Sequence, residues 1–260
     1  MNILVLCCFL IMGTACYTQN ERVLLPNYSA SPSGADDCKF ELSYLKQVDS
    51  IAQSTGMARH FSLIYSHAMR NVAEQVQSMD SNAMFFIKKF EIRFADYFLT
   101  AALDNKNGDL AATSEWQCFF SHPGARPWQL ILLGVNTHTN VDFWRSLVDN
   151  FSEKEIRRNK KQILACQYSI AKVYYEFFDL LIADKPYVRF INSFTKGLAK
   201  KIGERIIYKW RRRNVNLAIL FYYDHKKFER RLAATNRKKQ QIDRLILRKY
   251  KSSSEIALNK

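Results

Sequence analysis

The segment from Pro127 to Phe151 constrains the fold of this chain more than any other segment. It reads PWQLILLGVNTHTNVDFWRSLVDNF, and four polar residues alternate near its centre: Asn136, His138, Asn140 and Asp142. Alternation is typical of a strand, but a run of 25 residues that opens with a proline favours a helix. We therefore expect one long helix that carries polar residues among apolar ones.

On such a helix the four polar residues divide between two faces. His138 and Asp142 are four positions apart and share one face, while Asn136 and Asn140 share another. The asparagine face also carries four apolar residues: Leu132, Leu133, Phe143 and Leu147. Both amides should therefore lie against the core, where a polar group costs free energy unless it is hydrogen-bonded. The pattern predicts a polar centre inside a helical protein.

The rest of the chain is also helical in character. Glycine and proline are scarce, at 8 and 5 of 260 residues, and alternating β-branched runs are absent. Apolar spacing predicts helices over residues 41–53, 57–79, 83–104, 127–150, 153–183 and 187–209. Asp80 is placed to cap the third helix, and the run Asn105–Asp109 is a stop signal after it. We expect an all-α fold, an irregular multi-helix bundle around the central polar helix, in a domain spanning residues 38–195.

The first residues indicate export. The apolar run from Ile3 to Met12 has the length of a signal peptide and is too short to span a bilayer. Small residues then precede Cys16, as in the lipoprotein signals of bacteria, where the cysteine is lipidated after cleavage. This predicts a signal peptide over 1–16, a tether over 17–37 and a lipid anchor in a bacterial membrane, outside the cytoplasm. Gly13 stands where leucine is usual, so ordinary secretion is the alternative.

The net positive charge of +15 belongs to the last quarter of the chain. Residues 196–260 contain 20 Lys or Arg and 5 Asp or Glu, whereas residues 1–195 contain 19 of each kind. Apolar residues recur there at helical spacing, which predicts a basic amphipathic extension that binds anionic lipid or polymer. The export signal argues against nucleic acid as the partner. A solvated basic face, with a frayed tail from Lys249 onward, is the alternative.

The His138/Asp142 face suggests a chemical site. At this spacing the two side chains could bind one divalent ion such as zinc, with His122 from the preceding loop as a third ligand. A metal-bound water would then make the protein a hydrolase. Without metal, His138 would be a general base oriented by Asp142, and Asn136 and Asn140 would bind the oxygens of the ligand or substrate. Asp96 and Tyr97, on the helix over 83–104, could point toward the same place and help bind a ligand.

Two other interpretations remain open. The four polar residues could be a buried network that fixes helix packing and binds nothing, or the function could belong to the basic segment as a non-catalytic interaction surface. No phosphate-binding glycine loop and no nucleophile elbow occurs in the sequence, which excludes kinase, NTPase and serine-hydrolase readings. The sequence therefore predicts a ligand-binding or hydrolytic protein, and it leaves open whether the protein is an enzyme.

Two segments together resemble a known family. Phe94-Ala95-x-x-Phe98 is similar to an F-A-x-x-Y-F-x-A core, and Gly134-Val135-Asn136-Thr137-His138-Thr139-Asn140-Val141-Asp142-Phe143 is similar to a G-x-N-A-H-I-N-x-D-L signature, both from domain-of-unknown-function family 5995. Thr137 and Phe143 depart from its usual alanine and leucine. The resemblance covers about residues 45–185 and leaves the basic segment outside. It implies a helical, mostly bacterial family without an assigned activity, with Asn136, His138, Asn140 and Asp142 as its site.

Overall fold

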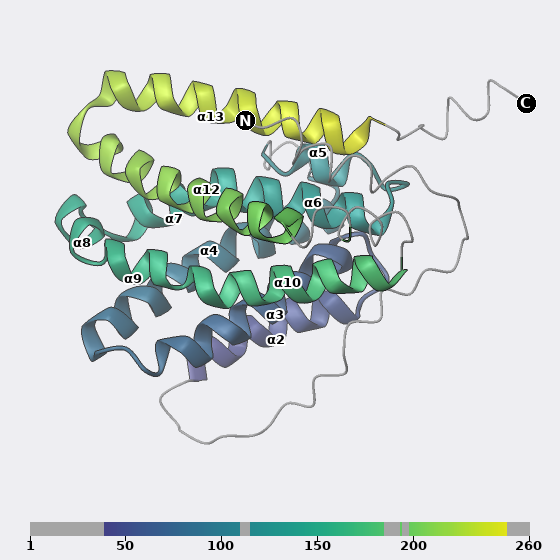
Figure 1. Ribbon diagram of the computed structural model, residues 1–260, viewed down its shortest axis with the longest axis horizontal. Coiled ribbons are helices and arrows are strands. Elements are labelled where there is room, and N and C mark those ends of the chain that lie inside the picture. The colour runs from purple at the N-terminus through teal and green to yellow at the C-terminus, as the bar shows by residue number, and fades with distance from the viewer. Residues whose placement is uncertain (1–38, 110–114, 185–192, 194–197, 249–260) are drawn as a thin grey trace, which may run out of the picture.

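All secondary structure that the computed structural model describes is helical, which confirms the all-α fold (Figure 1). The structure describes residues 39–109, 115–184, 193 and 198–248. The signal peptide, Cys16, the tether and the tail from Lys249 lie outside these residues, so what we expect of them stays a prediction. None of the described helices is both long and apolar enough to cross a membrane.

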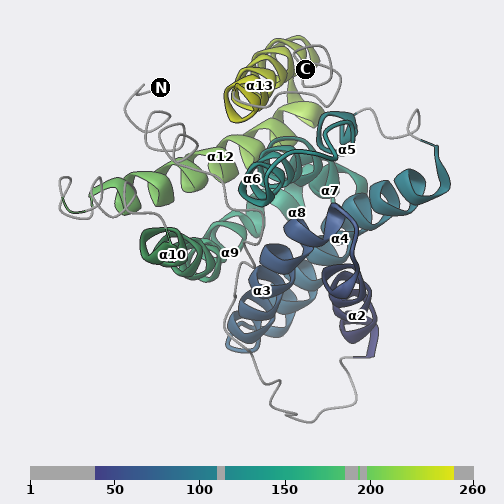
Figure 2. The ribbon, with the colours of Figure 1, turned by 90° about the vertical axis from the view of Figure 1, so that its right-hand side faces the viewer.

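The helices in chain order are α2 (Lys39–Gln53), α3 (Ala58–Val76), α4 (Ser81–Asn107), α5 (Gln117–Phe120), α6 (Pro127–Thr137), the π-helical turn η3 (His138–Asp142), α7 (Phe143–Asn150), α8 (Glu153–Arg158), α9 (Lys160–Ala165), α10 (Gln167–Asp184), α12 (Leu198–Tyr223) and α13 (His225–Leu247). Figure 2 shows α12 and α13 on one side of the molecule and α2 and α3 on the other, with α6 and α7 between them. The central helix is thereby surrounded by the rest of the bundle.

Both ends of α4 and the start of α6 lie at residues that are typical of helix ends. The Asp80 side chain accepts a hydrogen bond from the backbone N–H of Ala83 at 2.9 Å, as the N-cap of α4. Gly108 ends α4 with a left-handed φ of 82°, a conformation that glycine adopts without steric cost. Pro127 is the first residue of α6, where its missing N–H would have no partner in any case. Both predicted caps of α4 are therefore confirmed.

The central helix is continuous over residues 127–150, as predicted, but its middle turn is not α-helical. Residues His138–Asp142 form a π-helix between α6 and α7. A π-turn contains one extra residue and occurs frequently at functional sites. Helices α4, α12 and α13 all contact this turn, so it lies at the crossing point of the bundle.

The predicted helix over 153–183 is three helices in the structure, with breaks at Asn159 and Cys166. The Asn159 side chain donates to the backbone oxygen of Glu155 at 2.9 Å, and its backbone leaves the helical region with φ −95° and ψ 9°. Asparagine side chains compete for backbone groups in this way, which is why they favour helix ends over helix interiors. Apolar spacing alone did not reveal these breaks.

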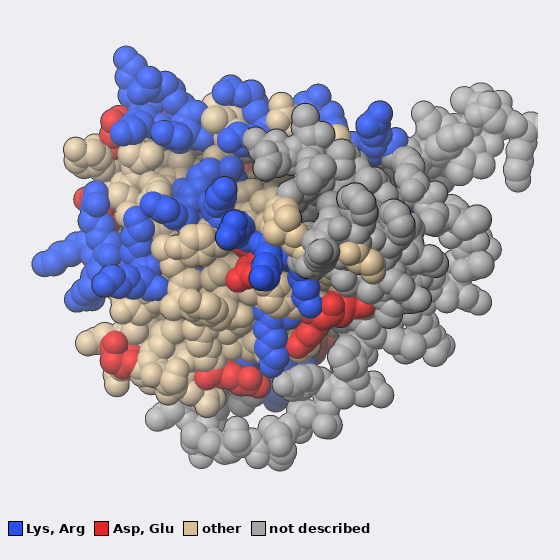
Figure 3. All heavy atoms as spheres, viewed as in Figure 1, with Lys and Arg blue, Asp and Glu red and all other residues tan. Residues whose placement is uncertain are grey.

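The basic segment belongs to the same core as the rest of the molecule. Val215, Leu217 and Ala218 of α12 are buried in that core, and so are Phe228 and Ile242 of α13. The boundary predicted at residue 195 from charge is therefore not a boundary of the core. Most of the charged side chains lie on the outer faces of α12 and α13, where Figure 3 shows Lys and Arg gathered. A charge count cannot distinguish an amphipathic helix that packs on a body from one that extends away from it.

Candidate functional site

His138 and Asp142 form a buried pair on η3. Only 4% of His138 and 1% of Asp142 is exposed, and His138 Nδ1 lies 2.9 Å from Asp142 Oδ2. The indole Nε1–H of Trp116 donates to the same Asp142 oxygen at 3.1 Å. The four-residue spacing predicted that the two side chains share a face, and the structure shows them in contact.

Aromatic rings enclose the imidazole of His138. The Phe94 ring stacks on it with centroids 3.5 Å apart and an angle of 14° between the planes. Tyr65 approaches at 4.5 Å and Phe61 at 5.4 Å, both edge to face. Among the described residues, His138 Nε2 and the second carboxyl oxygen of Asp142 have no hydrogen-bonding partner. Buried polar atoms rarely lack a hydrogen-bonding partner, so each of these two atoms needs a physical explanation.

Burial favours the uncharged forms of both members of the pair. It lowers the pKa of His138 well below 6.5, and the nearby charge of Arg211 acts in the same direction. Burial likewise raises the pKa of Asp142 well above 3.8, although the hydrogen bond from Trp116 opposes this. In an uncharged pair one proton lies between Asp142 Oδ2 and His138 Nδ1, and the other hydrogen is on Nε2. His138 then presents an N–H donor.

The asparagine face of the same helix is bonded throughout. Asn140 Nδ2 donates to Asn136 Oδ1 at 2.7 Å, and Asn136 Nδ2 donates to Asp243 Oδ1 at 2.8 Å and to the backbone oxygen of Lys239 at 3.0 Å. The Lys239 ammonium pairs with Asp243 at 2.8 Å, and Arg213 donates to Asn140. These contacts tie η3 to α12 and α13. The amides are thus satisfied by the basic segment, which the sequence had not connected with them.

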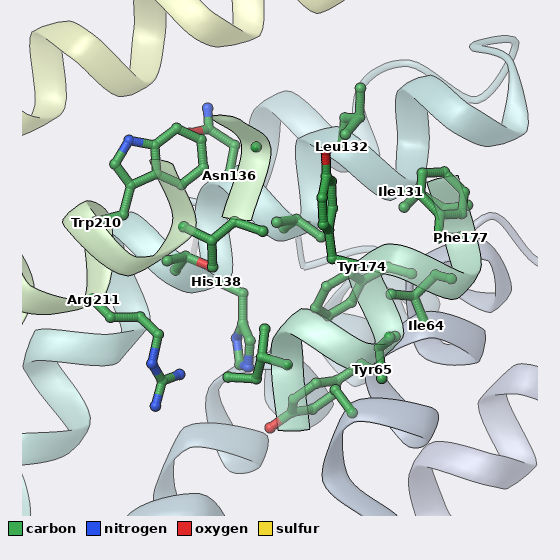
Figure 4. Close-up of a pocket in the computed structure, with 18 of the residues that line it drawn as sticks. Ile64, Tyr65, Ile131, Leu132, Asn136, His138, Tyr174, Phe177, Trp210 and Arg211 are labelled. Atoms are coloured by element: carbon green, nitrogen blue, oxygen red, sulfur yellow. The ribbon is translucent and has the colours of Figure 1, made fainter. Parts of the chain in front are cut away.

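A cavity of about 190 Å³ opens beside His138 (Figure 4). Its walls come from α3, α4, α6, η3, α10, α12 and α13 and are mostly apolar; they include Ile64, Ile131, Phe177, Ile206 and Trp210. For comparison, an apolar cavity of about 150 Å³ in another helical protein stays dry and binds benzene. The cavity here has room for a small apolar molecule in contact with His138.

Arg211 lines the same cavity and was not foreseen from the sequence. It is 2% exposed; its Nη2 donates to the backbone oxygen of Ile163 at 2.9 Å, and its guanidinium lies 4.8 Å from the centroid of the Phe143 ring. Within the described part of the chain it forms no ion pair with a carboxylate. It stands in a run of three arginines that suggested a solvated surface, yet Ile207, Arg211 and Val215 follow one another at helical spacing. That register was the signal that Arg211 faces inward.

A family model described as "Family of unknown function (DUF5995)" matches residues 42–249. The chain belongs to this family. The match confirms the resemblance seen in the central helix, and it extends through α12 and α13, which the resemblance had left outside. No curated protein and no solved structure matches the chain.

In this DUF5995 protein two of the predicted ligand-binding residues lie away from His138. The Asp96 carboxylate pairs with Arg93 one turn earlier on α4, and the Tyr97 hydroxyl donates to Asp149 at 2.6 Å. Both interactions are at the protein surface, where about a third of the Asp96 side chain is exposed. The expectation that these two side chains point inward is corrected. The register of α4 instead turns Phe94 and Phe98 toward the core.

The structure does not bring the three predicted metal ligands together. His122 Nδ1 lies 2.8 Å from the backbone oxygen of Cys118, in the loop before α6. Within the described ranges, no group of three or more His, Cys, Asp or Glu side chains is arranged to hold a metal ion. His138 and Asp142 therefore form a pair without a third protein ligand among these residues. Their chemistry in this arrangement is that of hydrogen bonding and proton transfer.

Proposed function

We propose that this protein binds a small, mostly apolar molecule in the cavity beside His138. The observation that carries the proposal is His138 Nε2, a buried atom without a partner among the described residues, on a histidine that lines a mostly apolar cavity. An empty cavity and an unsatisfied polar atom each reduce stability. Binding sites are where such costs are retained, and an apolar cavity with a few polar groups is their usual form.

The hydrogen bonds of Asn136 and Asn140 indicate that one face of the central helix serves packing and leaves the other face for binding. Asn136 and Asn140 have bonding partners on α12 and α13, so their contribution to packing is accounted for without a ligand. The His138 side of the same helix contributes a ring that is held in place by Asp142 but has one nitrogen unused. A structural role explains the first side. Ligand binding is the better explanation of the second.

Binding can be tested with 1-octanol as the probe, because Trp128 and Trp210 line the cavity and their fluorescence will report its occupation. We expect saturable quenching or a spectral shift on titration. Ala68 also lines the cavity, so Ala68→Leu should fill part of it and weaken binding. Ala233, exposed on α13, gives the matched control Ala233→Leu, which should bind as the parent does. Equal binding by both variants, or no saturable response in the parent, would contradict the proposal.

Hydrolysis is a second candidate, and the His138–Asp142 contact supports it. Asp142 orients the ring through Nδ1, as a carboxylate orients a general base, and Nε2 of this cavity-lining histidine has no partner among the described residues. A base needs a lone pair on Nε2, so the pair would have to release one proton first. This candidate predicts slow hydrolysis of p-nitrophenyl octanoate that increases with pH and disappears in His138→Gln. Activity that survives in His138→Gln would exclude it.

We further propose that the site is held at an anionic membrane surface, by a lipid on Cys16 and by the outer faces of α12 and α13. Lys226, Lys227, Arg230 and Arg231 are all exposed near the start of α13, and each near-surface cation adds about 1 kcal/mol of attraction to anionic lipid. The full chain should therefore sediment with phosphatidylglycerol vesicles at low salt. Lys226→Glu/Lys227→Glu should weaken this, and Cys16→Ser should abolish labelling with palmitate.

A further inference from the structure

We infer that the molecule bound in this cavity is a carboxylate with a short apolar body, such as a fatty acid of about eight carbons, whose charged end is held by Arg211. The inference rests on the proposed binding function and specifies its ligand. It comes from three features of the cavity: a buried cation without an ion pair among the described residues, buried donors without a partner there, and mostly apolar walls elsewhere.

The first feature is the burial of the Arg211 charge. Removing a cation from water costs several kcal/mol unless a paired anion and hydrogen bonds replace the water. Arg211 is fully covered, but the described contacts of its guanidinium are one carbonyl, that of Ile163, and the face of the Phe143 ring. Its Nε has no partner among the described residues. A bound carboxylate would supply the missing charge and accept from the unused donors.

The second feature is the set of polar side chains that line the cavity together with Arg211. Figure 4 shows the Arg211 and His138 side chains directed to the same side of the cavity, with Tyr65 close to His138. Arg211 and His138 both line the cavity. Both His138 Nε2 and the Tyr65 hydroxyl lack partners within the described structure. Arginine binds carboxylates through charge-assisted hydrogen bonds, and an N–H on His138 can donate to the second oxygen.

The third feature is the remainder of the wall. Away from Arg211 the lining is mostly aliphatic and aromatic, from Ile131, Phe177 and Ile206 among others, and suits a hydrocarbon chain. Glu91 also lines the cavity; burial lowers the pKa of Arg211, and the negative charge of Glu91 opposes this. Glu91 attracts the same guanidinium that the ligand would bind and repels the ligand itself. Removing its charge should therefore strengthen carboxylate binding.

Isothermal titration of the full chain with octanoate, 1-octanol and octylamine separates the contribution of the ligand's charge from that of its hydrocarbon chain. We expect the parent to bind octanoate at least about tenfold more tightly than 1-octanol, and octylamine most weakly. Arg211→Gln should weaken octanoate binding by about tenfold or more while leaving 1-octanol within about threefold, a difference that corresponds to one charge-assisted contact. Arg212→Gln is the matched control, because Arg212 is the exposed neighbour of Arg211, and it should change neither affinity. Glu91→Gln should strengthen octanoate binding several-fold.

The outcomes distinguish the two proposals. Binding of 1-octanol as tightly as octanoate by the parent would overturn the carboxylate inference and leave the cavity function standing. Equal losses for octanoate and 1-octanol in a folded Arg211→Gln would do the same. If Arg211→Gln does not fold, the parent's preference and the Glu91→Gln result decide, and a Glu91→Gln protein with weaker octanoate binding would contradict the inference. Failure of both octanoate and 1-octanol to bind the parent would overturn the proposed function itself.

Discussion

The two polar faces of the central helix are equally buried but differ in how their hydrogen bonds are satisfied. Asn136 and Asn140 bond to each other and to side chains of α12 and α13. His138 and Asp142 bond to each other and to Trp116, and each keeps one buried atom without a described partner. Burial alone therefore does not identify a site. The face with unused polar atoms beside a cavity is the candidate for binding, and the satisfied face is the candidate for stability.

The largest loss of stability should come from a substitution in the hydrogen-bond network of Asn136 and Asn140. Asp243→Ala would leave the buried ammonium of Lys239 without its partner and remove one acceptor of Asn136. Breaking a buried ion pair in this way costs about 3–5 kcal/mol in the free energy of unfolding. Chemical denaturation would measure it, with Glu229→Ala, exposed on the same helix, as a control expected to change stability by less than about 0.5 kcal/mol. A loss below 1 kcal/mol in Asp243→Ala would mean that the network is not structural.

A smaller loss is expected at the contact between α6 and α3. A Cβ added to Gly134 would lie 2.5 Å from the ring of Phe61, which also lines the cavity. Overpacking of this kind costs about 1–3 kcal/mol, and the displaced ring should weaken 1-octanol binding as well. Gly56 is the matched control, because a Cβ there meets nothing closer than 4.0 Å. Unchanged stability and binding in Gly134→Ala would show that Phe61 moves freely and does not define the cavity.

The dependence of stability on pH should separate the two members of the pair. His138 has a folded pKa below 6.5, so the unfolded chain binds more protons and stability falls as pH drops below 6.5. Asp142 has a folded pKa above 3.8, so its contribution is present below pH 3.8 and is lost as pH rises through the folded value. In the parent the two slopes oppose each other between these values. Each slope is at most about 1.4 kcal/mol per pH unit.

The variants should reveal the two slopes. Asp142→Asn should lose stability as pH falls from 6.5, because only the His138 contribution remains. His138→Gln should gain stability as pH falls toward 3.8, because only the Asp142 contribution remains. Thermal unfolding at several pH values would measure both. Two variants with the same pH profile would show that the pair is not held in its uncharged form.

Much of the architecture could be predicted because its signals are local. The caps at Asp80 and Gly108 and the shared face of His138 and Asp142 depend on residues a few positions apart. What could not be predicted depends on distant packing. The burial of α12 and α13 in the core became visible only in the folded chain, and the inward side chain of Arg211 was indicated in the sequence only by its register with Ile207 and Val215.

The predicted inward position of Asp96 and Tyr97 was wrong for the same reason. Position beside an apolar stripe did not show which way these side chains turn, and the surface partners Arg93 and Asp149 decided it. The π-helical turn at His138–Asp142 had no sequence signal that we could identify. Helical spacing alone therefore could not predict the position of the His138 ring within this turn.

The most direct test of ligand binding at His138 is a nitrogen NMR spectrum of the histidine rings, recorded with and without 1-octanol on protein labelled with 15N-histidine. The chain has five histidines, and the spectrum of His138→Gln identifies the resonances of His138 by their absence. We predict that the Nε2 resonance of His138 shifts as 1-octanol saturates the tryptophan fluorescence, while that of exposed His225 does not. An unchanged His138 resonance at saturation would show that the cavity beside it is not the binding site.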